Sequence, residues 1–170
     1  MNFEESTITK LYQNSVLAFP QTQMRQHATN PIKIVHLEWI PYVGMKTLYV
    51  KGIAHNEERT YNPVIVIKGV KYQEEKSKTN VPLIDNMGKK YLVEQMSFHK
   101  NDVLVRCNCG DHFWRFRHYN KLDKSLQGPD RKKYEAKHNP GSANPMQLPG
   151  MCKHLMKLAK ALDESGIIIQ

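Results

Sequence analysis

The segment DVLVRCNC, residues 102–109, joins an alternating aliphatic run to a Cys-x-Cys pair. Residues 102–106 are rich in β-branched and aliphatic side chains, which predicts a β-strand that leads into Cys107. Side chains two positions apart in extended backbone point to the same side, so the thiols of Cys107 and Cys109 are expected on one face. The strand therefore ends in two candidate metal ligands.

A second pair opens the segment PGMCKHLMKLAKAL, residues 149–162. A Pro-Gly dipeptide interrupts the chain, and leucine and alanine then recur at helical spacing up to a stop at Gly166. Residues two apart diverge on a continuous helix, so Cys152 is predicted at the N-cap or first turn if His154 is to reach the same ion. A thiolate there also lies at the positive end of the helix dipole.

Together the two pairs supply a complete tetrahedral donor set: Cys107, Cys109, Cys152 and His154. They use all three cysteines of the chain. Thiolate and imidazole are the donors that Zn²⁺ prefers, and four protein ligands leave no position for a substrate. The sequence thus predicts one zinc ion with a structural role.

Other interpretations of the cysteines remain open. They can be inert buried thiols, whereas a disulfide framework is disfavoured because their number is odd and no secretory signal or long apolar segment is visible. His112, His118 and His138 are rival fourth ligands, since the Cys-x-Cys pair and His112 also have a compact, ligand-like spacing. His154 is preferred because it alone belongs to a paired motif that opens a helix.

The arrangement CNC…MCKH resembles the SWIM-type zinc finger, whose signature is Cys-x-Cys, a variable insert and Cys-x-His. The insert here, residues 110–151, has 42 residues and is longer than usual in that family, so the resemblance does not imply its fold. It does imply a zinc finger over residues 107–170. It also permits a nucleic-acid-binding role, because the family includes DNA-binding and protein-binding members.

Three segments of the same region resemble small structural proteins of tailed bacteriophages: FWRFRHYN at 113–120, the Asn-Pro dipeptides at 139–140 and 144–145, and residues 149–162. This resemblance implies an adaptor subunit of the neck, tail or baseplate, assembled in the host cytoplasm and located in the virion. Its partners are then expected to be other virion proteins, in hetero- and homo-oligomeric contacts, without a membrane.

Residues 32–106 are predicted to form an antiparallel β domain. Runs of strand formers separated by turn residues lie at 32–40, 46–53 and 64–70 and are expected to pair as a meander. Residues 91–98 and 102–106 are predicted to form a further hairpin, and the polar segment between Tyr72 and Asn86 to be an exposed connection. The predicted fold class is α+β, an antiparallel β-rich domain followed by a C-terminal zinc finger that ends in an α-helix.

The two termini are harder to assign. Residues 1–31 are predicted to be an N-terminal arm, with 20–31 as a loop. Ser6 suits the N-cap of a helix through Leu17, but the following Thr-Ile-Thr weakens a helix there, and an arm that packs on a neighbouring chain is the alternative. The apolar tail 167–169 either closes the core or adds an edge strand to a partner. In an adaptor, the insert and both termini are expected to contact other subunits.

The net charge of +9 is concentrated in residues 113–160, which contain eleven Lys and Arg against three acidic residues. Such a region suits a phosphate backbone or an acidic protein surface, and aromatic residues interleaved with Arg115 and Arg117 can stack on bases. A zinc-finger nucleic-acid-binding protein is therefore the alternative function. The other interpretation is that basic residues offset the thiolates and the aromatic residues form a small core beneath the finger.

The sequence contains no recognisable catalytic constellation. It has no glycine-rich phosphate loop, no HExxH pair and no serine elbow. Cys152 and His154 do not suit a nucleophile and base, because both are committed to one cation. The chain is therefore predicted not to be an enzyme.

Overall fold

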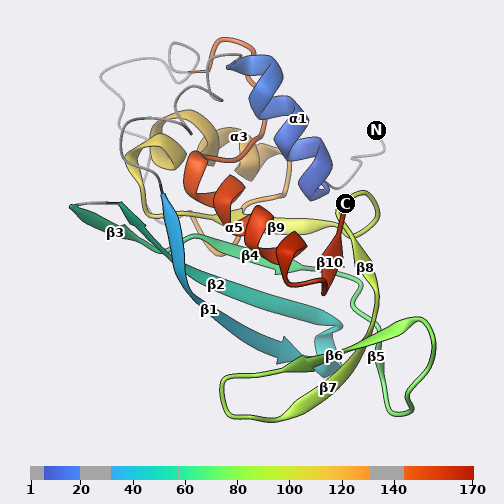
Figure 1. The fold of residues 1–170 in the computed structure, drawn as a ribbon. Helices are drawn as coiled ribbons and strands as arrows, with labels where there is room; N and C mark the ends of the chain where they lie inside the picture. Colours follow the sequence, from blue (N-terminus) through green and yellow to red (C-terminus); the bar gives the residue numbers. More distant parts are fainter. Residues whose placement is uncertain (1–5, 20–31, 57, 131–143) are drawn as a thin grey trace.

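The computed structural model of the protein describes residues 6–19, 32–56, 58–130 and 144–170, which combine antiparallel sheets with a few helices (Figure 1). The strands are β1 Lys33–Tyr42, β2 Thr47–Asn56, β3 Arg59–Tyr61, β4 Val64–Ile67, β5 Tyr72–Gln73, β6 Asn80–Ile84, β7 Lys90–Glu94, β8 Met96–Ser97, β9 Val103–Arg106 and β10 Ile168–Ile169. The helices are α1 Ile8–Ala18, the 3₁₀ turn η1 Val43–Met45, the π-helical turn η2 His112–Phe116, α3 Arg117–Leu122 and α5 Lys153–Glu164.

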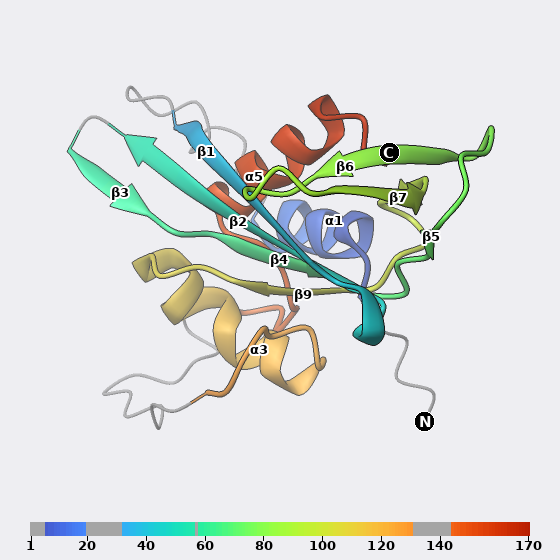
Figure 2. The same ribbon diagram turned by 90° about the horizontal axis from the view of Figure 1, so that it is seen from below.

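The main sheet is antiparallel and has the strand order β1–β2–β4–β9, with β3 also paired to β2 (Figures 1 and 2). Val50 lies opposite Ile65, which in turn lies opposite Val105. Such β-branched pairs pack well on a pleated surface. The strands predicted at 32–40, 46–53 and 64–70 correspond to β1, β2 and β4, and β9 leads to Cys107 as expected.

The hairpin predicted between residues 91–98 and 102–106 is wrong. β7 pairs with β5 and β6 in a separate small sheet, whereas β9 pairs with β4. The connection predicted between Tyr72 and Asn86 contains β6, which joins β7 through a turn in which the backbone N–H of Asp85 donates to the carbonyl oxygen of Lys89. Strand propensity is local and does not specify the partner strand. Segments that are adjacent in sequence, such as 91–98 and 102–106, can therefore belong to different sheets.

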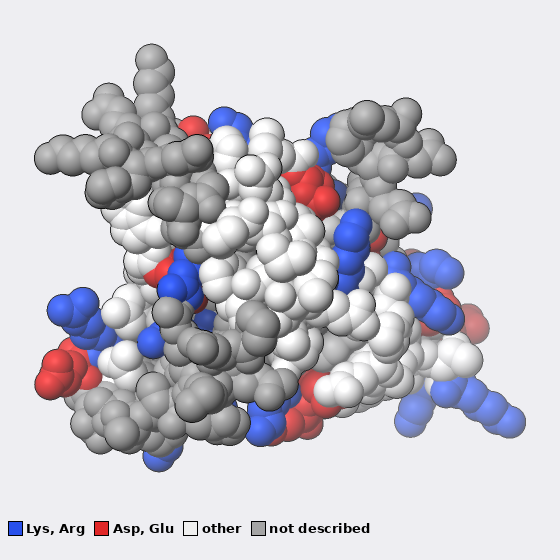
Figure 3. Space-filling view, turned by 90° about the horizontal axis from the view of Figure 1, so that it is seen from above, with Lys and Arg blue, Asp and Glu red and all other residues white. Residues whose placement is uncertain are grey.

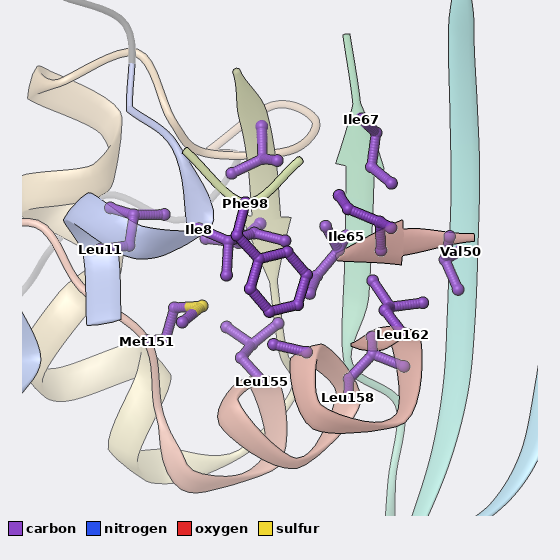
Figure 4. Close-up of a cluster of buried hydrophobic side chains, with 14 of the residues drawn as sticks. Ile8, Leu11, Val50, Ile65, Ile67, Phe98, Met151, Leu155, Leu158 and Leu162 are labelled. Atoms are coloured by element: carbon purple, nitrogen blue, oxygen red, sulfur yellow. The ribbon is translucent and has the colours of Figure 1, made fainter. Parts of the chain in front are cut away.

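The helix α5 lies against the main sheet and fills the core with one apolar face (Figure 4). Leu155, Leu158 and Leu162 recur at helical spacing and are buried. Gly52 in β2 permits the close approach, because a Cβ atom there would lie 2.9 Å from Cδ1 of Leu158. Burial of each leucine contributes about 1.5–3 kcal/mol. The predicted helix is therefore confirmed, and it anchors the second ligand pair on the sheet.

Residues 6–19 pack on the chain's own core, so the helical alternative for this segment is correct. The hydroxyl of Thr7 accepts a hydrogen bond from the backbone N–H of Lys10 and caps α1. The predicted cap, Ser6, instead donates to the carboxylate of Asp123. Ile8 is buried in the hydrophobic core together with the rest of the inner face of α1. The loop predicted at 20–31 lies outside the described residues.

The C-terminal tail closes the core of the same chain. β10 pairs in parallel with β8, and Ile168 is fully buried. One hydrophobic core thus collects side chains from all three predicted segments, 1–31, 32–106 and 107–170. Ile8, Leu11 and Ile168 are thus buried by the chain itself, whereas Leu17 and Ile169 are exposed.

A buried polar network positions the segment that leads into α5. The backbone N–H of Gly150 donates to Oδ1 of Asn120 at 2.9 Å, and Nδ2 of Asn120 donates to the carbonyl oxygen of Gly150 at 3.0 Å. The backbone N–H of Met151 donates to Oγ of Ser15 at 2.8 Å. A Cβ atom on Gly150 would lie 2.5 Å from Oγ of Ser15 and 2.7 Å from Cε1 of Phe116. No other residue fits this junction without displacing buried atoms.

We expect Gly150→Ala to lower the free energy of unfolding by about 1–3 kcal/mol, because the added methyl group overlaps atoms that the network holds in place. Gly44→Ala is the matched control, since nothing lies within 4 Å of the position of its Cβ atom. Urea unfolding of both variants measures the difference. Equal stabilities would show that the junction adjusts freely.

Candidate metal centre

The four predicted ligands meet where β9 ends and α5 begins. Cys107 and Cys109 follow β9, Cys152 is the N-cap of α5, and His154 lies in the first turn of that helix. The backbone of Cys152 is extended, with φ −71° and ψ 169°, which confirms the cap position that the spacing requires. The four ligand atoms all lie within 4.8 Å of one another.

The four ligand atoms are close enough to share one ion. Zinc–sulfur bonds of about 2.3 Å separate the sulfur atoms of a regular tetrahedron by about 3.8 Å. The Nδ1 atom of His154 lies 3.8 Å from Sγ of Cys107 and 4.0 Å from Sγ of Cys152, so Nδ1 is the ring atom that faces the sulfurs. Each of the four residues is at most 4 % exposed. The group can therefore hold a metal ion away from solvent.

The three thiols do not ionise together in the absence of a cation. Hydrogen bonds from Cys107 and Cys152 hold the pKa of Cys109 well below its usual range. The hydrogen bond to Cys109 raises the pKa of Cys107 to about 12, and burial raises the pKa of Cys152 well above its usual value. The three sulfurs alone thus favour a single thiolate. A divalent cation among them favours three, because it offsets their mutual repulsion.

Neighbouring groups orient the ligands. The backbone N–H of His112 donates to Sγ of Cys109 at 3.3 Å. The ring of Tyr61 lies against the imidazole of His154, with centroids 4.3 Å apart and an interplanar angle of 33°. The Nε2 atom of His154 is buried and has no hydrogen-bond partner among the described residues. Packing against Tyr61 therefore takes the orienting role that a hydrogen bond to Nε2 often has in metal sites.

The rival histidines do not join this group. His112 is buried, and burial lowers its pKa to about 4, but its ring nitrogens are not among the clustered ligand atoms. The ring of His118 packs against Tyr119, with centroids 5.1 Å apart. His138 lies outside the described residues. In the part of the chain that the structure describes, the imidazole that accompanies the three cysteines is that of His154.

The FWRFRHYN segment packs largely inward. Phe116, Arg117 and Tyr119 are buried, and Arg115 pairs with Asp111 at 2.9 Å. The predicted stacking on bases is therefore wrong for Phe116 and Tyr119, whereas Trp114 is 52 % exposed and its stacking stays a prediction. Phe116 instead joins the main hydrophobic core, where its ring centroid lies 5.6 Å from that of Phe19, and Arg117 contacts Phe113 and Asp130.

Sequence reasoning missed the residues that support the centre from a distance. Asn120 and Ser15 bind the backbone just before Cys152 through hydrogen bonds that span 30 and 136 residues. No local pattern marks them, because an asparagine or serine in a helix is more often solvent-exposed.

No protein-family model, curated protein or solved structure matches this chain. Within the described residues, no helix combines the length and hydrophobicity that a membrane span requires.

Proposed function

We propose that Cys107, Cys109, Cys152 and His154 bind one zinc ion in a SWIM-like centre whose role is structural. The observation that carries this proposal is the burial of four protein donors whose ligand atoms all lie within 4.8 Å of one another. A catalytic zinc ion keeps a position open for water or substrate, whereas a structural ion has four protein ligands. The ion would tie the end of β9 to the start of α5, and the proposal includes no enzymatic activity.

The role proposed for the folded chain is that of an adaptor subunit in the virion of a tailed bacteriophage, in the neck, tail or baseplate. The resemblance of the insert and of residues 149–162 to small phage proteins supports this role. A structural metal ion also suits it, since cross-linking a small core gives a rigid body for contacts with other virion proteins.

Exposed apolar side chains support contacts with proteins. Met45 in η1 is 74 % exposed and Met87 in the β6–β7 turn is 92 % exposed. Methionine is flexible and polarisable, and it adapts well to partner surfaces. Figure 3 shows, on the side of α1, a surface whose centre is largely uncharged, with both basic and acidic side chains toward its edges. Such a surface suits a protein partner better than a phosphate backbone.

Nucleic-acid binding is the alternative that the excess of positive charge supports. Trp114 and Lys121 are exposed in the most basic part of the chain. Arg115 and Arg117, however, are paired with acidic side chains of the same chain. Fewer cations therefore face solvent than the sequence suggests, which makes this alternative second.

Quantitative mass spectrometry of nuclease-treated particles, purified from infected cells that produce this chain, tests the adaptor role. We expect a fixed copy number relative to the major capsid protein. The purified chain is expected to bind random-sequence DNA weakly at about 150 mM salt. Absence from particles, together with DNA affinity that falls steeply between about 50 and 200 mM salt, would replace the adaptor role with the nucleic-acid-binding role.

A further inference from the structure

A cavity of about 600 Å³ adjoins the metal centre beside η2 and α3. Its wall includes Arg106 at the end of β9, Arg117 at the start of α3, and residues 127–129. Cys107 and Cys109 also contribute to the wall, but neither arginine takes part in the metal group. The cavity thus brings two cationic side chains together, and zinc binding requires neither of them.

Arg117 is the most unusual residue of this cavity, because it is only 5 % exposed. Its Nη1 atom lies 3.1 Å from Oδ1 of Asp130, and its guanidinium carbon lies 3.9 Å from the centroid of the Phe113 ring. Its Nε and Nη2 atoms are buried and have no hydrogen-bond partner within the described residues. A buried donor without a partner costs about 1–3 kcal/mol, and more when it is charged. The Nε–Nη2 edge therefore has no acceptor among the described residues, and Oδ1 of Asp130, although 3.1 Å from Nη1, also has no hydrogen bond there.

The charged groups in or next to this wall are Arg106, Arg117 and Lys121 against Asp130 and the thiolates of Cys107 and Cys109. The carboxylate of Asp130 is shared between Arg117 and Lys121, whose Nζ atom lies 3.8 Å from Oδ2. Arg106 donates to backbone oxygens, from Nε to Gln127 and from Nη2 to Pro129 at 2.8 Å. Both arginines line the same cavity, where a bound anion would offset their like charges.

We propose that this cavity binds an oxyanion, a carboxylate or phosphate group, through the Nε–Nη2 edge of Arg117. The two N–H bonds on this edge are nearly parallel, and their spacing matches two oxygens of such a group. Asp130 holds the opposite side of the guanidinium, and Phe113 fixes its plane, so the edge is preorganised. The site is distinct from the zinc centre, and the proposal does not depend on the virion role.

The test is a titration of the zinc-loaded full chain with sodium phosphate and, separately, with sodium acetate, at an ionic strength kept constant with sodium chloride. We expect a saturable shift of the Arg117 Nε–H resonance in ¹H–¹⁵N spectra. Arg117→Lys keeps the charge but loses the fork, so the affinity, followed at the backbone amide of His112, is expected to fall about tenfold or more. Lys90→Gln, which removes an exposed charge on β7, is the control and is expected to leave the affinity unchanged.

Asp130→Asn provides a second variant whose effect has the opposite sign. It removes the negative charge next to Arg117, so we expect anion affinity to rise several-fold. If Arg117 has a purely structural role, this variant should be less stable and should show no gain in anion affinity. The Asp130→Asn result therefore tests anion binding even if Arg117→Lys does not fold.

The two anions separate the possible sources of the group. Tighter binding of phosphate assigns the site to a phosphoryl ligand, and tighter binding of acetate assigns it to a carboxylate. The proposal would be overturned if neither anion gave a saturable shift. Unchanged affinity in Arg117→Lys, together with a loss in Lys90→Gln, would also overturn it, because that result would indicate general charge attraction.

Discussion

Removal of zinc with a chelator is expected to unfold the region around the metal centre and to bring the whole protein close to unfolding at 25 °C. Zinc bound in small finger modules contributes about 10–16 kcal/mol of apparent binding energy, which becomes folding energy. A domain as a whole is stable by only about 5–15 kcal/mol. Since the cluster joins the ends of a 42-residue insert, its loss also restores the entropy that closing this loop removes.

Hydrogen exchange of backbone amides measures this effect by region. We expect residues 110–122 and 144–162 to lose protection first, while the β1–β2 hairpin, which pairs over its whole length, retains protection longest. The starting protein should contain one equivalent of zinc by elemental analysis. Addition of zinc should restore protection, whereas addition of magnesium, which prefers oxygen ligands, should not. Unchanged exchange after chelation, or less than half an equivalent of zinc beforehand, would contradict the structural centre.

The second large effect is expected from substitution of the ligands themselves. The double variant Cys109→Ser, Cys152→Ser removes one thiolate from each pair. Loss of a residue that only hydrogen-bonds a metal ligand typically lowers metal affinity roughly 10–100-fold, and we expect zinc affinity to fall by more than that here. His154→Gln removes the imidazole whose Nδ1 atom faces Cys107 and Cys152. We expect both proteins to retain less than half an equivalent of zinc after dialysis, as measured by elemental analysis.

Two further histidine variants serve as controls for this prediction. His118→Gln changes a residue that packs against Tyr119 and is expected to keep one equivalent of zinc. His112→Gln tests the rival ligand, and its zinc content should also stay at one equivalent, because the hydrogen bond to Cys109 comes from the backbone. Loss of zinc in His112→Gln with retention in His154→Gln would reassign the fourth ligand. Retention of zinc in the double cysteine variant would contradict the proposed zinc site.

The sequence was sufficient to predict the features that depend on neighbours along the chain. The strands at 32–40, 46–53 and 64–70 follow from β-branched composition, and α5 follows from the spacing of its leucines, because these patterns act within a few residues. The same short range applies to each ligand pair. Cys-x-Cys on an extended segment and Cys-x-His at a helix cap restrict where those side chains point. The four side chains therefore form one group as soon as the two segments lie next to each other.

Only the tertiary structure decided which segments meet and which side chains they bury. The run at 91–98 became part of two small sheets instead of a hairpin with β9, because the choice of partner strand depends on contacts far apart in sequence. Ser6, predicted as a helix cap, is bound to Asp123. Arg117 is buried because its guanidinium group contacts the ring of Phe113 and the carboxylate of Asp130 in the interior. Composition sets how strongly a residue prefers water on average, but its actual burial depends on the partners that the rest of the fold brings to it.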